Sequence, residues 1–277
     1  MGGVKGSFNF LSSAGLLAYN WRQGCRTEER QFPGPAMIVL LTDFGQSEYV
    51  GMMKGVIYRA YGEAKIVDLC HEIGPQSIVE ASWVLKNGYR YFPPGAIFCC
   101  VVDPGVGTER KALAVRTAEY HFVAPDNGLL WETLREREIV ETRAIPVPQD
   151  ASSTFHGRDV FAKAAGEISL GRFETLGPQI ERIEKLEFPL DGRKGVVVRV
   201  DRFGNIVTNL SAAGQREYSV KAGEQQWNMD CYRTYEVAPD NELFLIEGSC
   251  GTLEISLKNG AANDRLRLEV GQPIEIS

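Results

Sequence analysis

The sequence predicts two domains: an N-terminal α/β domain with a doubly wound, mainly parallel sheet, and a C-terminal all-β domain, barrel-like or a sandwich. Three observations lead to this prediction. Apolar runs of strand length alternate with amphipathic helical stretches up to about residue 170. Residues 172–192 are charged and interrupted by Pro and Gly, as in a linker. Beyond them, short β-type runs recur at turn-like spacing. We therefore expect the α/β domain over residues 37–185 and the β domain over residues 192–277.

In the α/β domain, residues 38–43 form a continuous apolar run that ends in an acid, which is typical of a buried parallel strand. A helix opening near Gly45 follows. Ser77 can cap another helix that runs to about residue 91, where a Pro-Pro-Gly turn ends it. The other expected elements are strands over 64–69 and 96–102, a hairpin-like pair over 112–115 and 121–124, a short helix over 129–135, a strand over 140–145 and a helix over 160–170.

In the β domain, the expected strands are short and separated by turn-forming residues. They cover residues 196–200, 206–210, 231–237, 243–246, 253–257 and 266–268.

Residues 1–36 are interpreted as a leader outside both domains. Lys5 precedes a weak apolar patch, and a polar stretch follows from Arg22 to Gln31. A signal peptide is an alternative, although no clear small-residue cleavage site follows the patch. We expect a disordered or artefactual leader, with Met37 as a plausible natural start.

The composition is that of a soluble globular protein. Of the 277 residues, 44% are hydrophobic and 24% are charged, and the formal net charge is -6. Nucleic-acid surfaces need clustered Lys and Arg, so this charge argues against nucleic acid as a partner. No apolar run approaches the roughly 20 residues that span a bilayer, so no membrane association is expected.

The cysteines predict a cytoplasmic protein with reduced thiols. They form no Cys-x-x-Cys pair and lie mostly in apolar runs, which favours core thiols over a disulfide framework or a zinc site. They are Cys25, Cys70, Cys99, Cys100, Cys231 and Cys250. Because the chain has only 3 histidines, we predict no metal site.

The stretch from Val101 to Arg110 predicts a ligand site. The apolar strand ends at Asp103, a Pro-Gly turn follows, and Arg110 arrives 7 residues after the acid. Open α/β sheets bind ligands at the carboxyl ends of their strands, and Gly105 and Gly107 permit a sharp turn and a close approach to a ligand. On spacing alone, the alternative is a surface turn with an ordinary ion pair.

Other residues have both a functional and a purely structural interpretation. Asp43, at the carboxyl end of the first strand, suits a bidentate grip on ribose hydroxyls, or is an acid favoured by a helix dipole. His156, between Phe155 and a glycine, could be catalytic or a satisfied core histidine. Asp201 could simply form an Asx turn. A kinase is excluded, because the Asp-Phe-Gly and His-Gly-Arg-Asp stretches stand in reversed order and no phosphate loop is present.

Six stretches together carry a resemblance to a known family. They are LTDFG (41–45), YVGMMKG (49–55), VDPGVGTER (102–110), APDNGLL (124–130), FHGRD (155–159) and DRFGNIVTN (201–209). The chain from residue 37 onward resembles the S-adenosylmethionine (SAM) hydroxide adenosyltransferases, relatives of the bacterial fluorinase and chlorinase. The resemblance implies an N-terminal α/β domain, a C-terminal barrel-like domain, and a homotrimer that binds its ligand between neighbouring subunits.

Within the family, the resemblance favours hydrolysis over halogenation. The Asp-Arg-His set of the hydrolytic members falls on Asp103, Arg110 and His156. The fluorinase has Tyr in place of Asp103, Tyr-Ser in place of His156-Gly157, and Trp in place of Gln76. An acid, a base and a guanidinium suit the polarisation of water better than the caging of a halide.

The implied reaction is attack of water or hydroxide at C5′ of SAM, which gives adenosine and L-methionine without a metal or further cofactor. Asp103 and His156 would position the water and take its proton, and Arg110 would supply positive charge.

The substrate-binding residues follow from the same resemblance. Asp43 would hold the ribose hydroxyls and Asn205 the adenine edge. Asp201 and Ser249 would take the ammonium and carboxylate ends of the methionine. Two further residues, Phe155 and Tyr235, would pack against the nucleoside. The fluorinase has Arg after its serine, where this chain has Cys250.

Two alternative functions remain at this stage. One is a halide-dependent, chlorinase-like adenosyl transferase, which Gly157 alone would permit because a chlorinase also has glycine there. The other is a non-catalytic sensor of an adenosyl ligand, in which the Asp-Arg-His set is only structural.

Overall fold

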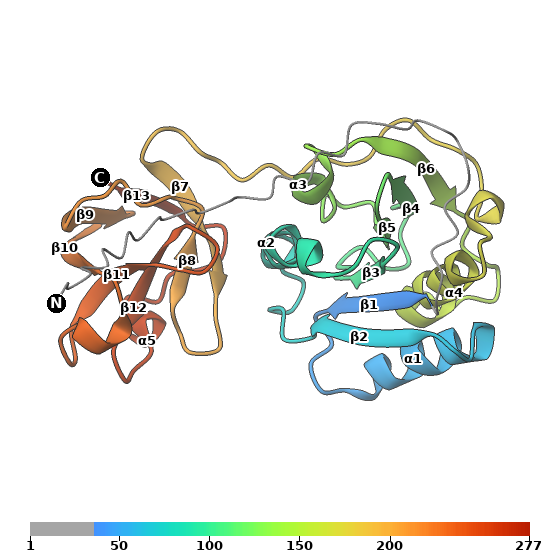
Figure 1. The fold of residues 1–277 in the computed structure, drawn as a ribbon, viewed down its shortest axis with the longest axis horizontal. Helices are drawn as coiled ribbons and strands as arrows, with labels where there is room; N and C mark the ends of the chain where they lie inside the picture. Colours follow the sequence, from blue (N-terminus) through green and yellow to red (C-terminus); the bar gives the residue numbers. More distant parts are fainter. Residues whose placement is uncertain (1–35) are drawn as a thin grey trace, which may run out of the picture. The chain divides into compact units, whose positions relative to one another are not determined.

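The computed structural model describes residues 36–277, which form an α/β part and a β-barrel (Figure 1). The leader expected over residues 1–36 lies outside the described residues, apart from its last residue. No helix in residues 36–277 is both long and apolar enough to cross a membrane. The fold class expected from the sequence is confirmed.

The α/β part is built on a six-stranded, mainly parallel sheet with the strand order β2-β1-β3-β5-β4-β6. Strands β2, β1, β3 and β5 run parallel, whereas β4 is antiparallel to both β5 and β6. The hairpin-like pair expected over 112–124 is therefore confirmed as β4 and β5. The strands are β1 (Met37–Thr42), β2 (Lys65–Cys70), β3 (Ile97–Val101), β4 (Ala112–Thr117), β5 (His121–Pro125) and β6 (Ile139–Ile145).

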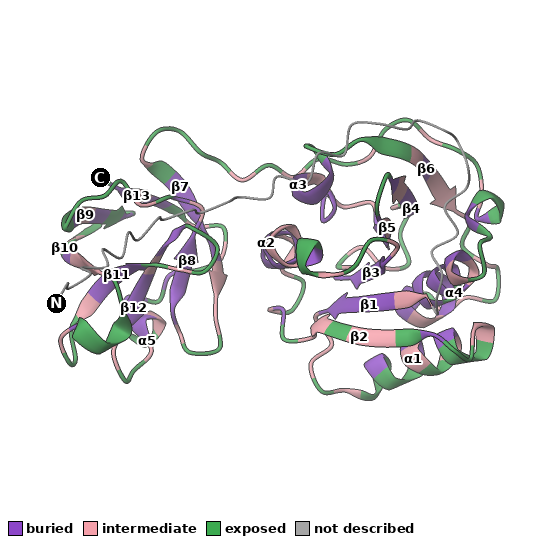
Figure 2. Cartoon of the chain, in the orientation of Figure 1, coloured by how far each residue is buried: buried purple, intermediate pink, exposed green. Residues whose placement is uncertain are grey.

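Helices cover both faces of this sheet. The helices are α1 (Glu48–Ala60), α2 (Ile78–Gly88), α3 (Trp131–Leu134) and α4 (Ala162–Ser169), with 3₁₀ turns at Tyr89–Tyr91 and Phe173–Thr175. Along β1, Ile38 and Leu40 pack with α1 and α4, while Val39 and Leu41 pack with α2 and α3. Because successive side chains of a strand point to opposite faces, an unbroken apolar run is what such a doubly covered strand requires. Figure 2 shows β1 and β3 almost entirely buried in the sheet.

Two helix starts differ in detail from the expectation. Ser77 occupies the N-cap of α2, but its side chain makes no capping hydrogen bond. The helix expected from residue 160 is preceded by one π-helical turn, Gly157–Phe161, which begins directly after His156. Such wide turns often occur at functional sites because they displace a side chain from the regular helical position.

The second part is a closed seven-stranded barrel with the order β10-β11-β12-β8-β7-β13-β9. Its interior is filled by side chains such as Tyr218, Val220, Leu245 and Ile255. The strands are β7 (Lys194–Val200), β8 (Ile206–Thr208), β9 (Glu217–Ala222), β10 (Gln225–Tyr232), β11 (Leu243–Glu247), β12 (Leu253–Leu257) and β13 (Pro273–Ile276).

Two expectations for the barrel were wrong, and two strands were missed. Residues 266–268 are not a strand: α5 (Ala262–Leu266) ends there, and Arg267 has a left-handed backbone with φ 52°. The strand expected over 231–237 ends at Tyr232, and a 3₁₀ turn, Tyr235–Val237, follows. Strands β9 and β13 were missed because only every second residue in them is buried, so neither forms an apolar run.

Candidate functional site

The α/β part carries a pocket of about 190 Å³ where β1 and β3 end. Such an edge is where open α/β sheets hold their ligands. Every lining residue belongs to the α/β part: Asp43, Phe44, Gln76, Val101, Asp103, Val106, Thr154, Phe155, His156 and Gly157.

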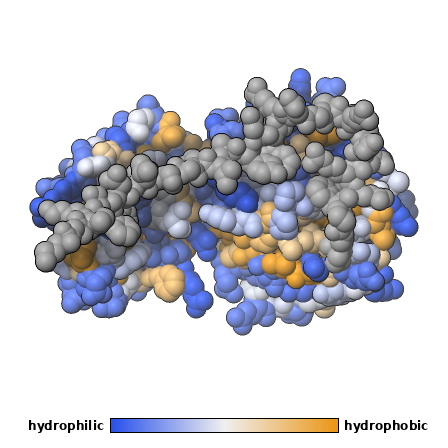
Figure 3. All heavy atoms as spheres, viewed as in Figure 1, coloured by the Kyte–Doolittle hydropathy of each residue, from blue (hydrophilic) through white to orange (hydrophobic). Residues whose placement is uncertain are grey.

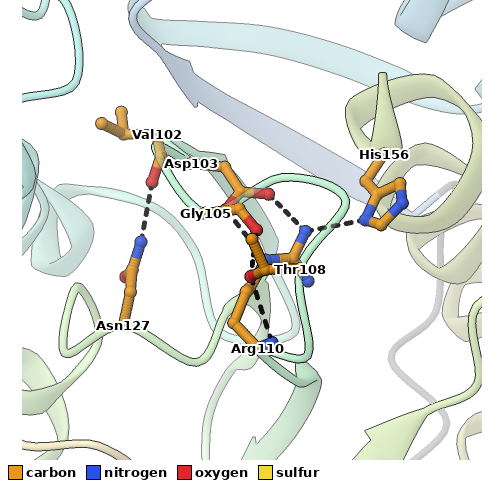
Figure 4. A network of polar contacts seen from close by, with 7 residues as sticks. All are labelled: Val102, Asp103, Gly105, Thr108, Arg110, Asn127 and His156. Carbon is orange, nitrogen blue, oxygen red and sulfur yellow. Dashed lines mark hydrogen bonds and ion pairs between the residues drawn. The ribbon is translucent and has the colours of Figure 1, made fainter. Parts of the chain in front are cut away.

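The loop after β3 is folded tightly and presents Asp103 to the pocket. The N–H of Val106 donates to the carbonyl of Asp103 at 3.2 Å, and the Thr108 hydroxyl donates to the carbonyl of Gly105 at 2.7 Å. Asn127 Nδ2 donates to the carbonyl of Val102 at 2.9 Å and so fixes the end of the strand (Figure 4).

Gly107 explains how the loop after β3 meets the loop before His156. Its φ is +78°, and a Cβ at this position would overlap the carbonyl oxygen of Ser153. Only glycine tolerates both the backbone angle and this approach. The glycine noted in the sequence therefore brings together two chain segments that are far apart in sequence.

Arg110 joins Asp103 and His156 into one cluster, as the sequence predicted. Its Nε donates to Asp103 Oδ1 at 2.8 Å, and its Nη2 donates to Asp103 Oδ2. The same Nη2 lies 2.9 Å from His156 Nδ1, so the guanidinium sits between the carboxylate and the imidazole (Figure 4). The side chains of Arg110 and Asp103 are only 9% and 6% exposed. The contact with His156 adds a hydrogen bond to this buried ion pair, whereas Arg110 Nη1 is buried without a hydrogen-bond partner among residues 36–277.

The three side chains do not have equal access to the pocket. Asp103 and His156 line it, whereas Arg110 is not among the lining residues and lies behind them, with its guanidinium 5.1 Å from the centre of the Phe161 ring. Arg110 therefore acts on a ligand mainly through Asp103 and His156.

The contact with Arg110 determines the protonation of His156. A guanidinium has only donors, so His156 Nδ1 must be the acceptor, which leaves the ring neutral with its proton on Nε2. Burial, followed by the positive charge of Arg110, lowers the pKa of His156. Both observations favour a neutral imidazole whose Nε2–H is a hydrogen-bond donor.

Asp43 is held by an unusual loop. Its Oδ2 accepts the backbone N–H of Gln76 at 2.8 Å, and Gln76 has a left-handed backbone with φ 63°. Non-glycine residues in this conformation are uncommon and often mark functional sites. Burial raises the pKa of Asp43, although the hydrogen bond from Gln76 opposes that shift. One N–H on Oδ2 leaves acceptor positions on both carboxylate oxygens, so the bidentate grip on ribose hydroxyls stays a prediction.

Phe155 lies in the pocket wall within an aromatic cluster that the sequence did not reveal. Its ring centre lies 5.8 Å from that of Phe44 and 4.8 Å from that of Tyr49. Gly157 packs on the same ring, since a Cβ there would lie 3.0 Å from Phe155 Cε2. The rings meet tilted or edge to face rather than stacked, and the cluster gives one side of the pocket an apolar wall.

The other predicted site residues, Asp201, Asn205, Tyr235 and Ser249, lie on the barrel and do not line this pocket. Asp201 Oδ1 accepts the backbone N–H groups of Phe203 and Asn205, at 2.8 and 2.9 Å, and its Oδ2 accepts Nδ2 of Asn205. This is the Asx turn that the sequence left open as an alternative. The Tyr235 hydroxyl lies 3.4 Å from the Ser256 hydroxyl, and burial raises the pKa of Tyr235. Ser249 is exposed.

Within residues 36–277, no group of three or more His, Cys, Asp or Glu side chains is arranged to hold a metal ion. The five cysteines in this range are free thiols, and Cys99 and Cys100 are fully buried.

Fold and site together define a class: a two-domain protein that combines an α/β sheet, a barrel and a buried Asp-Arg-His cluster. Two family models match the chain. The model of the SAM hydroxide adenosyltransferase N-terminal domain matches residues 38–177, and that of the C-terminal domain matches residues 195–275. The chain belongs to the SAM hydroxide adenosyltransferase family, which confirms the resemblance seen in the sequence.

Individual relatives agree with this assignment. An (R)-S-adenosyl-L-methionine hydrolase from Thermus thermophilus is 36% identical over 256 residues, which cover 86% of this chain and 98% of the relative. A more distant relative, a fluorinase from Actinopolyspora mzabensis, is 26% identical over 64% of this chain and 74% of its own length. The crystal structure of an uncharacterized conserved protein from Thermotoga maritima superposes with a TM-score of 0.79 at 35% identity. The superposition covers 87% of this chain and 100% of the Thermotoga maritima chain.

Proposed function

We propose that this protein hydrolyses SAM to adenosine and L-methionine, with Asp103, Arg110 and His156 as the catalytic set. The observation that carries the proposal is the buried Asp103–Arg110–His156 cluster beside Asp43, with Asp103 and His156 in the pocket wall. The relative from Thermus thermophilus, which matches along almost its whole length, supports the same reaction.

The sulfonium makes the leaving group easy, so the site must mainly supply a well-placed nucleophile. Water attacks C5′ in line with the departing sulfur. The new C5′–O bond forms as the C5′–S bond breaks, and the electron pair of the broken bond becomes a lone pair of the methionine thioether. The leaving group departs neutral and needs no acid. Holding the water at near-attack distance can provide up to about 7–11 kcal/mol of the barrier reduction.

The water is held between a donor and an acceptor. Nε2–H of His156 donates to one lone pair of the water, while a carboxylate oxygen of Asp103 accepts one of its protons. The second lone pair of the water is then free to attack C5′. Arg110 keeps the Asp103 carboxylate oriented and keeps His156 in the required tautomer.

Asp103 is the proton acceptor in this proposal. Attack by neutral water produces a protonated alcohol at C5′, which is a far stronger acid than water. A carboxylate is basic enough to take that proton late in the reaction. The proton then passes to solvent, and adenosine and methionine leave.

The nucleoside and the methionine require walls beyond the described pocket. A pocket of about 190 Å³ is smaller than the roughly 300–1,000 Å³ of typical ligand sites. We propose that the barrel residues Asp201, Asn205, Tyr235 and Ser249 complete the site from a neighbouring copy of the chain, within the homotrimer that the family resemblance implies. Tyr49, a member of the aromatic cluster, is 43% exposed and offers apolar surface to such a neighbour. Figure 3 shows hydrophobic residues near β1 and β2 on the visible face.

The test is product analysis with purified protein and SAM, with and without chloride. We expect adenosine and methionine in equal amounts, independent of chloride. 5′-Chloro-5′-deoxyadenosine would instead identify a chlorinase, and tight binding without turnover would identify a sensor.

Asp103→Ala should bind SAM but release adenosine at least about 100-fold more slowly, because general acid–base groups typically contribute 10²–10⁴-fold. Glu72→Gln, an exposed change outside the pocket, is the matched control. Normal turnover by Asp103→Ala would disprove the assigned role.

The epimer of the substrate can be tested in the same assay. The name of the Thermus thermophilus relative specifies the (R) configuration at sulfur. We propose that this protein also prefers the (R)-sulfonium epimer. Separated epimers should then differ in kcat/KM, and equal rates would refute the preference without affecting the proposed hydrolysis.

A further inference from the structure

His71 belongs to no catalytic or binding set assigned above, yet it holds the segment that carries Asp43. The backbone carbonyl of His71 accepts the N–H of Gly45 at 2.8 Å. On the other side of the segment, His71 Nδ1 lies 2.8 Å from the hydroxyl of Thr42. Asp43 and Phe44, both lining the pocket, lie between these two attachment points.

The position of His71 depends on an irregularity in β2. The pairing of β1 with β2 shifts between Leu40, opposite Asp68, and Leu41, opposite Cys70. One residue of β2, Leu69, is therefore left over. Bulges of this kind redirect the side chains that follow them and occur frequently beside active sites. Here the shift brings the residue after Cys70 level with the end of β1.

The hydrogen bonds have a consistent direction. The Thr42 hydroxyl accepts the N–H of Phe44 at 3.3 Å, so its own proton can be donated to His71 Nδ1. The His71 proton then resides on Nε2, which lies 3.1 Å from Asp68 Oδ1, although at an angle poorer than that of a normal hydrogen bond. Asp68 is itself fixed by Lys54 Nζ at 2.7 Å.

An acid, an imidazole and a hydroxyl in series resemble a nucleophilic triad, but this set cannot act as one. Thr42 is fully buried and is not among the residues that line the pocket, so its hydroxyl does not reach a substrate. What the series can do is orient the Asp43–Phe44 segment from behind.

We propose that His71 is a positioning residue for ribose recognition, which sets the orientation of Asp43 through Thr42 and Gly45. This inference rests on the proposed role of Asp43 in holding the ribose hydroxyls. It predicts that His71 affects affinity for the diol of the nucleoside specifically, rather than affinity for the nucleoside in general.

The experiment compares the binding of adenosine and 2′,3′-dideoxyadenosine by calorimetry in the full-length protein. In the unmodified protein, adenosine should bind more tightly because only adenosine offers hydroxyls to Asp43. In His71→Ala, Asp43 should lose its orientation and with it a hydrogen bond from the ribose hydroxyls. The preference for adenosine should then fall about tenfold, because a hydrogen bond to a charged group typically contributes at least that much to affinity. Binding of the dideoxy compound should remain unchanged.

Four further variants make the test independent of any one substitution. Thr42→Val, which keeps the shape of the side chain, should reduce the preference as His71→Ala does, and the double variant should lose no more than either single one. His71→Asn retains an amide near the Nδ1 position and should restore part of the preference. Glu72→Gln, the exposed neighbour, should leave it unchanged.

The outcomes separate this inference from the proposed function. If the unmodified protein binds both nucleosides equally or binds neither, the role of Asp43 is wrong. If it prefers adenosine and folded His71→Ala or Thr42→Val keeps that preference, only the role of His71 is wrong. Equal weakening of both nucleosides would show a general structural role and would also overturn the inference.

Discussion

At the scale of single residues, the contact between Arg110 and His156 decides what the imidazole can do. The sequence assigned the removal of the water's proton jointly to Asp103 and His156. Because Arg110 donates to Nδ1, His156 already carries its proton on Nε2 and is placed to donate rather than to accept. Spacing along the chain could not reveal this, since a tautomer depends on the partner of each ring nitrogen.

Substitutions of His156 can distinguish a donor from a base. His156→Gln places an amide N–H near the Nε2 position, whereas the shorter His156→Asn cannot reach it. We expect His156→Gln to retain at least about tenfold more activity than His156→Asn, because loss of one such donor typically costs 10²–10³-fold in kcat.

The pH dependence of kcat tests the protonation state of His156. Since burial and Arg110 lower the pKa of His156, the neutral donor form should persist below pH 6.5, and the rate should not fall there on account of His156. A rate that falls with a pKa near 6.5 in the unmodified protein, but not in His156→Gln, would contradict the lowered pKa of His156.

At the scale of secondary-structure elements, the β4–β5 hairpin contains a second histidine with a perturbed pKa. Burial, followed by the charge of Arg116, lowers the pKa of His121 from 6.5 to about 4. The unfolded chain therefore binds a proton at His121 between pH 6.5 and pH 4, whereas the folded chain does not. Folding stability from this group is complete above pH 6.5 and is lost as the pH falls towards 4.

Replacement of His121 should reduce the sensitivity of the protein to acid. As the pH falls from 7 to 5, this histidine should lower the free energy of unfolding by about 2 kcal/mol. Denaturant unfolding of His121→Gln at the two pH values should show a correspondingly smaller loss than the unmodified protein. The same loss in both proteins would mean that other groups cause the acid sensitivity.

The elements also show where local sequence patterns succeed. The strands β1 and β3 were recognised because both of their faces are buried, so that apolar residues follow one another without interruption. In the barrel, β9 and β13 bury only alternate residues, and Leu266 and Leu268 suggested a strand where a helix end with a left-handed Arg267 is found.

At the scale of the whole molecule, the central question is whether one site uses two chains. The Asp103–Arg110–His156 cluster and its pocket belong to the α/β part, and four of the proposed substrate-binding residues belong to the barrel. A site completed by a neighbouring copy makes a prediction about mixtures of inactive variants, because each variant can supply the half that the other lacks.

Asp103→Ala damages the α/β half of such a site, and Asp201→Asn damages the barrel half while keeping an acceptor for the Asx turn. When the two inactive variants are co-refolded in equal amounts, half of the α/β halves and half of the barrel halves are intact. Random assembly of closed rings should therefore restore about a quarter of normal activity. Asp103→Ala mixed with His156→Ala is the control and should remain inactive, because both changes lie in the same half. No recovery in the first mixture would argue for sites contained within single chains.

The sequence by itself determined the fold class, because burial on two faces and turn chemistry leave local patterns. The six matching stretches determined the family, and the resemblance to that family selected Asp103, Arg110 and His156 as the proposed catalytic set. The tertiary structure alone decided that Arg110 lies behind Asp103 and His156, that Gln76 holds Asp43, and that His71 anchors the segment carrying Asp43. These are contacts between segments far apart in the chain, and hydrogen-bond partners of that kind are set by the packing of strands and loops.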